Sequence, residues 1–334
     1  MKWIHHLLAA TGIALASASA WADKPALTVY TYDSFVSDWG PGPIITKAFE
    51  AICGCQLKLV GVEDGAALLS RLKMEGKQSR ADVILGLDTS LTGEATATDL
   101  LAPHGVELNQ VDLAIDWSDK VFLPYDYGHF AFVYDSDRLT TPPTSLRALV
   151  NDAGGPNIII QDPRTSTPGL GFLLWMRQVF GNDTSEAWKK LAPRILTVTK
   201  GWSEAYGLFL EEEALMVLSY TTSPAYHQHV EKTERYRAAA FSEGHYAQIE
   251  VAAKVAHSPH QALADQFLAF MLSPGFQNII PTTNWMYPAT RSHTALPAAF
   301  DSLVSPKATL LFDASVVARQ RKIWIREWLD ALSD

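Results

Sequence analysis

ADVILGLD, residues 81–88, is a continuous apolar run, as expected of a parallel β-strand that is buried on both faces. Two strands are predicted before it, LTVYTY at 27–32 and QLKLVGV at 56–62. Apolar residues at helical spacing lie between these strands, at 44–52 and again after the capping residue Asp64. Strand, helix, strand, helix, strand is the order of a doubly wound α/β lobe.

The same alternation returns in the second half of the chain. Strands are predicted at 157–162, 195–200 and 214–220, with helical segments between them. The runs 122–133 and 246–255 are long enough to cross between lobes. The sequence has no repeat and no flexible linker, so we predict an α/β protein of two lobes. Each lobe is a doubly wound sheet, and crossover strands form the hinge.

Both predicted lobes are discontinuous in the sequence. The first comprises residues 23–124 and about 250–290. The second comprises residues 125–249 and the C-terminal helix region at about 291–334. The crossing strands carry the chain from one lobe to the other and back.

Polar residues at favourable positions predict where several helices begin. Thr167 is the expected N-cap of one helix, and a proline follows it in the first turn. Asp183 opens a capping box. Ser203, Ser258 and Asp313 are the expected caps of three further helices.

Residues 1–22 have the pattern of a secretory signal peptide. Lys2 lies in a polar start, residues 7–16 are apolar, and Ala20-Trp21-Ala22 predicts cleavage after Ala22. The alternative is a membrane anchor, but the apolar run is too short to span a bilayer of roughly 30 Å. No later stretch is long and apolar enough to do so. We therefore expect an exported, soluble mature protein.

The composition restricts the class of partner. The 334 residues carry a formal net charge of −9, which argues against nucleic acid and against an anionic membrane surface. A hydrophobic fraction of 48% is typical of a globular protein. This mild acidity suits a small neutral or cationic ligand.

Cys53 and Cys55 are the two cysteines of the chain. In an exported protein a local disulfide is plausible, whereas two thiols alone are too few for a structural zinc site. We expect a structural role, and the pattern leaves the oxidation state open.

Aromatic and hydroxyl side chains gather between Thr199 and Tyr226. Trp202 lies on a predicted loop, and Tyr220-Thr221-Thr222-Ser223 follows a buried strand. The end of such a strand is where open α/β sheets usually bind ligands. Aromatic residues in loops suit stacking on a flat or cationic ligand, although core packing would also explain them. Further aromatic residues outside this stretch are Tyr32, Trp39 and the segment Asn284-Trp285-Met286-Tyr287.

Two helix starts also offer groups for a ligand. Ser166-Thr167 precedes a helix and supplies hydroxyls and free backbone N–H groups, which suit an anion or phosphate. Asp64-Gly65 begins a helix directly after a strand, and its carboxylate could face an amine or a cation. Capping of their own helices explains both segments equally well.

Enzyme and metal motifs are weak. GWSEA, at 201–205, resembles a nucleophile elbow around Ser203 but lacks the second glycine. His227 and His229 have no further ligands at a suitable spacing for a metal. We therefore predict no catalytic residue, no metal and no cofactor.

Several long segments together resemble one family, the periplasmic thiamine-binding proteins of ABC importers, which are solute-binding proteins. They include LTVYTYDSF, DWGPGP, ADVILGLD, QDPRTSTPGLG, TVTKGWSEAYGLFL, LSYTTSPAY and NWMYP. The resemblance implies a two-lobed periplasmic binding protein of type II that closes on thiamine, thiamine monophosphate or thiamine diphosphate. It also implies a periplasmic monomer that delivers this ligand to an inner-membrane ABC permease and its ATPase.

The resemblance further implies which residues line the ligand. Those at positions that match the family are Asp64, Gly65, Ser166, Thr167, Trp202, Tyr220, Thr221, Thr222 and Ser223; expected neighbours are Tyr32, Trp39 and Tyr226.

Two alternatives remain open at this point. A protein of the same fold could bind a ferric ion or an inorganic anion, with Tyr220 and Tyr226 as possible iron ligands. A secreted serine hydrolase would use Ser203 as its nucleophile.

Overall fold

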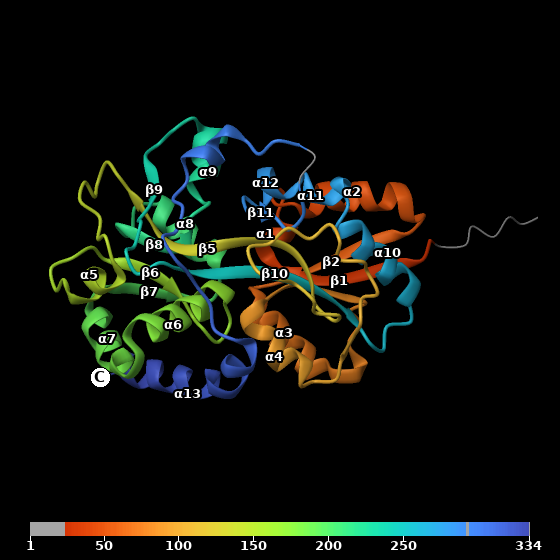
Figure 1. Cartoon of the computed structure of the whole chain (residues 1–334), viewed down its shortest axis with the longest axis horizontal. Helices are drawn as coiled ribbons and strands as arrows, with labels where there is room; N and C mark the ends of the chain where they lie inside the picture. Colours follow the sequence, from red (N-terminus) through yellow and green to blue (C-terminus); the bar gives the residue numbers. More distant parts are fainter. Residues whose placement is uncertain (1–23, 292–293, 334) are drawn as a thin grey trace, which may run out of the picture.

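The computed structural model describes residues 24–291 and 294–333. The predicted signal peptide, residues 1–22, lies outside the described residues. The strands form one central layer along the length of the molecule, and helices cover both of its faces (Figure 1). None of the described helices has the length and apolar character needed to cross a membrane.

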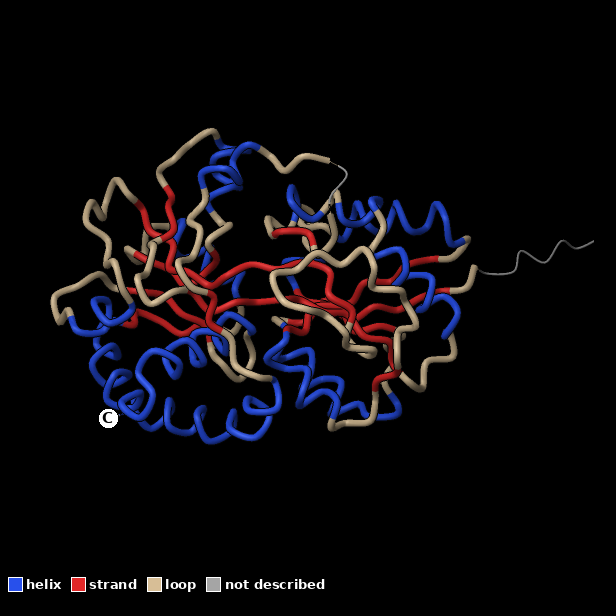
Figure 2. Tube along the Cα trace, viewed as in Figure 1, coloured by secondary structure: helices blue, strands red, loops and turns tan. Residues whose placement is uncertain are grey.

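The central layer is one continuous sheet with the order β2-β1-β3-β10-β5-β8-β6-β7. Figure 2 shows its strands between the two helical layers. The strands of this path are β1 Ala26–Tyr32, β2 Gln56–Val62, β3 Val83–Asp88, β5 Leu123–Asp135, β6 Ile158–Gln161, β7 Ile195–Thr199, β8 Met216–Tyr220 and β10 His245–Val255. Short strands pair at its sides: β4 Leu101–Ala102, β9 Tyr236–Ala238, β11 Tyr287–Pro288 and β12 Thr309–Leu310.

The two long strands β5 and β10 join the halves of the sheet. At one end β10 pairs antiparallel with β3, and at the other β5 pairs antiparallel with β8. Between these ends β5 and β10 pair with each other. The predicted crossover strands therefore exist, and their mutual pairing merges the two predicted sheets into one. The outer strands are parallel, β1 with β2 and β3 on one side and β6 with β7 and β8 on the other.

Helices pack on both faces because each half alternates strands with amphipathic segments. In the first half, α2 and α10 lie on one face, and α3 and α4 lie on the other (Figure 1). The last helix, α13, contacts both α4 and α7 and so lies along both halves. The α-helices are α1 Asp33–Val36, α2 Gly42–Cys53, α3 Gly65–Glu75, α4 Thr89–Thr96, α5 Leu146–Asn151, α6 Thr167–Phe180, α7 Thr184–Leu191, α8 Trp202–Leu210, α9 Pro224–Tyr226, α10 Gln261–Met271, α11 Pro274–Gln277, α12 Ile280–Thr283 and α13 Ala314–Ser333.

Several predicted caps are wrong in detail. Ser166, not Thr167, is the N-cap of α6, and its hydroxyl accepts a hydrogen bond from the Gly169 N–H. Ser203 lies inside α8, which begins at Trp202 without a side-chain cap. Asp183 precedes α7, but its side chain makes no capping bond.

Other predicted helix ends agree with the structure. Asp64 caps α3 by accepting from the Gly65 N–H, and Asp313 accepts from the Ser315 N–H at the start of α13. Ser258 accepts from the His260 N–H, although α10 begins only at Gln261.

Cys53 and Cys55 form a disulfide where α2 ends. Cys55 is buried, and Gly54 between the two cysteines has a φ of 63°, which glycine adopts without strain. The expected structural role of this pair is therefore confirmed, and both sulfurs are oxidised.

Candidate functional site

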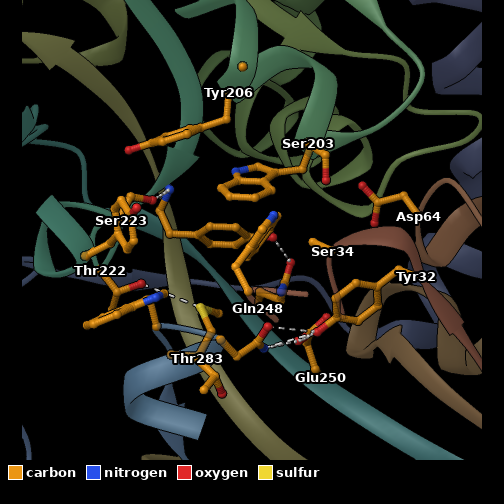
Figure 3. Close-up of a pocket in the computed structure, with 18 of the residues that line it drawn as sticks. Tyr32, Ser34, Asp64, Ser203, Tyr206, Thr222, Ser223, Gln248, Glu250 and Thr283 are labelled. Atoms are coloured by element: carbon orange, nitrogen blue, oxygen red, sulfur yellow. Dashed lines mark hydrogen bonds between the residues drawn. The ribbon is translucent and has the colours of Figure 1, made fainter. Parts of the chain in front are cut away.

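A cleft of about 360 Å³ lies where the two halves of the sheet meet. Its walls come from both halves: the ends of β1 and β2, the start of α8, the end of β8, the crossing strand β10, and the segment after α12. Figure 3 shows side chains from these elements pointing into one space. The lining residues are Tyr32, Ser34, Trp39, Glu63, Asp64, Trp202, Ser203, Tyr206, Gly207, Leu210, Tyr220, Thr222, Ser223, Tyr226, Gln248, Glu250, Thr283, Asn284, Trp285 and Met286.

Aromatic rings form much of the cleft wall. Trp202 stacks on Tyr206 with ring centroids 4.9 Å apart, and its other neighbour is Trp39 at 6.3 Å. The indole N–H of Trp202 donates to Ser219 Oγ at 2.7 Å, which fixes the plane of the ring. Trp39 is 57% exposed, a large fraction for a tryptophan. Such rings offer the π-faces that attract a flat or cationic ligand.

The carboxylate of Asp64 lies at the starts of three helices. It accepts hydrogen bonds from the Gly65 N–H and from Ser166 Oγ, each at 2.8 Å. The backbone N–H groups of Thr167 and Trp202, the first residues of α6 and α8, also act on this carboxylate and lower its pKa. Helix N-termini carry partial positive charge, so they favour an anion there. Even so, burial raises the pKa of Asp64, because loss of water outweighs these bonds.

Hydroxyl groups are concentrated where β8 ends. Ser223 Oγ lies 2.7 Å from Ser219 Oγ and accepts from the Tyr220 N–H at 3.2 Å. Tyr220 donates its phenol hydrogen to Gln248 Oε1 at 3.1 Å. Thr222 contacts the sulfur of Met286 at 3.5 Å. These bonds hold the polar side chains at the edge of the cleft.

Eight of the twelve residues named from the sequence line the cleft: Tyr32, Trp39, Asp64, Trp202, Tyr220, Thr222, Ser223 and Tyr226. The other four, Gly65, Ser166, Thr167 and Thr221, are buried and do not line it. A β-carbon on Gly65 would lie 2.3 Å from Thr167 Oγ1, so only glycine fits between α3 and α6. Thr167 Oγ1 is buried and has no hydrogen-bond partner among the residues that the structure describes.

Two buried acids beside the cleft were not found by sequence reasoning. Glu250 on β10 lies opposite Asp126 on β5, and the two carboxyl groups are within hydrogen-bonding range of each other. Tyr32 donates to Glu250 Oε2 at 3.0 Å, as Figure 3 shows. Burial raises the pKa of Glu250 to about 7, and burial also raises the pKa of Asp126 well above its usual value. In the sequence, Asp126 and Glu250 each appear as an acid inside an otherwise apolar strand. This pattern does not indicate that the two side chains lie opposite each other.

The remaining polar candidates have other roles. Within the described residues, no group of three or more His, Cys, Asp or Glu side chains could hold a metal ion. His227 lies 2.9 Å from the Tyr206 hydroxyl and 2.7 Å from Glu231, and burial lowers its pKa. Ser203 lines the cleft, but no hydrogen bond among the described residues joins it to a histidine.

Comparison with known proteins identifies the family. The sequence profile of the bacterial extracellular solute-binding proteins matches residues 78–312, more than two-thirds of the chain. The chain belongs to this family. The solute-binding protein is 58% identical to the thiamine-binding periplasmic protein of Escherichia coli strain K12, over 93% of this chain and 94% of the relative.

Solved structures agree with this assignment. A periplasmic thiamin binding protein superposes on the solute-binding protein with a TM-score of 0.91 and 58% sequence identity, covering 93% of this chain and 97% of that one. Iron-bound HitA from Pseudomonas aeruginosa has a TM-score of 0.73 over 92% of this chain and 99% of its own, but at 20% identity it shares the fold alone. The predicted two-lobed fold and family resemblance are therefore confirmed. So is the prediction that the protein serves transport and not catalysis.

Proposed function

We propose that this solute-binding protein captures thiamine, together with its mono- and diphosphate, in the periplasm. The observation that carries the proposal is the cleft itself, which combines aromatic rings with buried acids and helix N-termini. Thiamine joins a flat aminopyrimidine to a thiazolium ring with a fixed positive charge. A relative at 58% identity that is named for thiamine binding adds independent support.

Each part of the ligand has a matching part of the cleft. The ring faces of Trp39, Trp202 and Tyr220 suit the two flat rings, and a cation over such a face gains about 0.5–2 kcal/mol. Asp64 suits the amino group or the positive charge. A phosphate would find hydroxyls and backbone N–H groups at the starts of α6 and α8. The proposed ligand residues are Asp64, Gly65, Ser166, Thr167, Trp202, Tyr220, Thr221, Thr222 and Ser223, with Tyr32, Trp39 and Tyr226 as neighbours.

Delivery requires partners and a motion. The protein would act as a monomer after cleavage behind Ala22, and would present its ligand to an inner-membrane ABC permease with its ATPase. Residues 23–124 with about 250–290, and 125–249 with about 291–334, would close as two lobes about β5 and β10. Ligand contacts from both lobes would stabilise the closed form.

A titration of the purified mature protein tests the proposal. Thiamine, its mono- and diphosphate, and ferric ion are added separately while tryptophan fluorescence is followed, because Trp39, Trp202 and Trp285 all line the cleft. Saturable binding of thiamine with no response to ferric ion supports the proposal. Tight binding of ferric ion alone would overturn it in favour of an iron-binding protein of the same fold.

A further inference from the structure

Three neighbouring strands place an acid at the same level of the sheet. Glu250 on β10 lies opposite Asp88 on β3 and opposite Asp126 on β5. All three are buried, with Asp88 and Asp126 fully so, and only Glu250 lines the cleft. Buried carboxyl groups are costly unless they are neutral, hydrogen-bonded or paired with a cation.

Asp126 and Glu250 share a set of hydrogen bonds. Asn284 donates to Asp126 Oδ2 at 2.7 Å and to Glu250 Oε2 at 3.4 Å. A hydrogen bond between the two carboxyl groups requires a proton on one of them, because two carboxylates are both acceptors. Asp126 Oδ1 has no hydrogen-bond partner within the part of the chain that the structure describes, so the pair is incompletely satisfied by the protein.

The groups that face Glu250 do not balance its charge. Tyr32 and Tyr125 are neutral donors near it, and burial raises the pKa of both phenols well above their usual value. In residues 24–291 and 294–333, no lysine or arginine forms an ion pair with Asp88, Asp126 or Glu250. The titratable groups around Glu250, element by element, are Tyr32 on β1, Asp64 before α3, Asp88 on β3, Tyr125 and Asp126 on β5, and Tyr220 on β8.

We infer that Glu250 and Asp126 form a proton-linked counter-ion for the cationic ring of the ligand, so that binding exchanges a proton of this pair for the fixed positive charge. The inference rests on the proposed function. In the empty cleft the proton neutralises the buried pair. A cation in the cleft replaces it as the compensating charge, Glu250 becomes fully ionised, and the proton leaves to solvent. Asp126 keeps its own proton and continues to donate to Glu250.

The sign of the pH dependence follows directly. Burial raises the pKa of Glu250 to about 7, so the free protein holds a proton there that the complex gives up. Affinity therefore falls as the pH falls below about 7, approaching tenfold per pH unit, and levels off above it. Near neutral pH the complex should release about half a proton for each ligand bound.

Titration calorimetry measures this release directly. Thiamine is titrated into the intact mature protein at about pH 7 in two buffers with different heats of ionisation, and the difference in apparent enthalpy gives the number of protons exchanged. A release near half a proton, vanishing above about pH 8.5, supports the inference. Binding with equal apparent enthalpy in both buffers would overturn it while leaving the proposed function intact. Absence of thiamine binding would overturn both.

Substitutions of Glu250 and Asp126 test whether the proton released on binding comes from this pair. Glu250→Gln should release no proton from the pair and bind more weakly at high pH, with an affinity that converges on the wild-type value at low pH. Asp126→Asn keeps a neutral donor to Glu250, as the protonated Asp126 does, so this variant should bind thiamine and still release about half a proton near neutral pH. The matched control is Glu63→Gln, because Glu63 is an exposed acid of the same cleft. The number of protons that Glu63→Gln releases on binding should equal that of the wild type. If Glu63→Gln lost the proton release while Glu250→Gln kept it, the assignment to the pair would be refuted.

Discussion

Ser166 Oγ donates a hydrogen bond to Asp64 Oδ2 at 2.8 Å, and so joins the start of α6 to the start of α3 across the two halves of the molecule. A backbone bond from the Ala67 N–H to the Thr165 carbonyl, also 2.8 Å, lies beside it. Two hydrogen bonds within the protein thus connect the two halves of the molecule between α3 and α6. Asp64 occupies a position between helix N-termini that would also suit a ligand anion.

Ser166→Ala should lower both stability and ligand affinity. The change removes a helix cap, which costs about 0.5–2 kcal/mol, and also leaves a buried carboxylate with one bond fewer. Thermal unfolding and calorimetric titration with thiamine measure the two effects. Ser145→Ala is the matched control, because Ser145 caps α5 by accepting from the Ala148 N–H, away from the cleft. Equal affinity in both variants would remove the bond to Asp64 from the binding mechanism.

Trp202→Ala should weaken thiamine binding by about 5–30-fold, the equivalent of 1–2 kcal/mol for a lost cation–π and stacking face. Calorimetry is the suitable measurement, since the variant removes a fluorescent reporter. Trp202→Phe keeps an aromatic face but loses the hydrogen bond to Ser219. Its affinity for thiamine should therefore lie between that of the wild type and that of Trp202→Ala. Unchanged affinity in Trp202→Ala would contradict the proposed stacking.

Gly65→Ala should prevent α3 and α6 from approaching as they do here. The new methyl group would lie 2.3 Å from Thr167 Oγ1 and 2.4 Å from the Gly86 carbonyl oxygen, and backbone cannot yield as a flexible side chain can. We expect a loss of about 1–3 kcal/mol of unfolding free energy, measured by urea denaturation. Gly207→Ala is the control: it lies in α8 with no atom near the added methyl, so it should gain about 0.5–1 kcal/mol.

The strands were predictable because their apolar runs are long and bounded by turn residues. Residues 81–88 and 246–255 correspond to β3 and β10 within two residues. The caps were less predictable, since Ser166 and Thr167 are both good capping residues and only packing decides between them. Continuity of the sheet was not predictable, because it depends on β5 and β10 pairing over a long separation in sequence.

The site divides in the same way. Trp202 and Tyr220 could be found because aromatic residues near a strand end and a helix start are a local pattern. Glu250 and Asp126 could not, because a single acid in an apolar strand gives no sign of the partner opposite it. Sequence reasoning thus found residues that belong to a local sequence pattern. It missed residues that come together only through the register of two strands far apart in the sequence.

Asp88→Asn should make the protein more stable than the wild type as the pH rises. Burial raises the pKa of Asp88 to about 7, against 3.8 as its ordinary value, so the folded state holds a proton that the unfolded state has lost. Stability is therefore highest below the unfolded pKa and is lost as the pH rises from about 4 to 7, by at most about 4 kcal/mol. Asparagine caps α4 as well as aspartate does and carries no charge, so the variant avoids this loss.

Urea unfolding of the wild type and of Asp88→Asn at pH 5 and pH 8 measures the difference in their unfolding free energy. This difference should be larger at pH 8. Asp313→Asn, at an exposed cap with a lowered pKa, should show the same difference from the wild type at both values. A constant difference for Asp88→Asn would mean that Asp88 is ionised in the folded protein throughout this range.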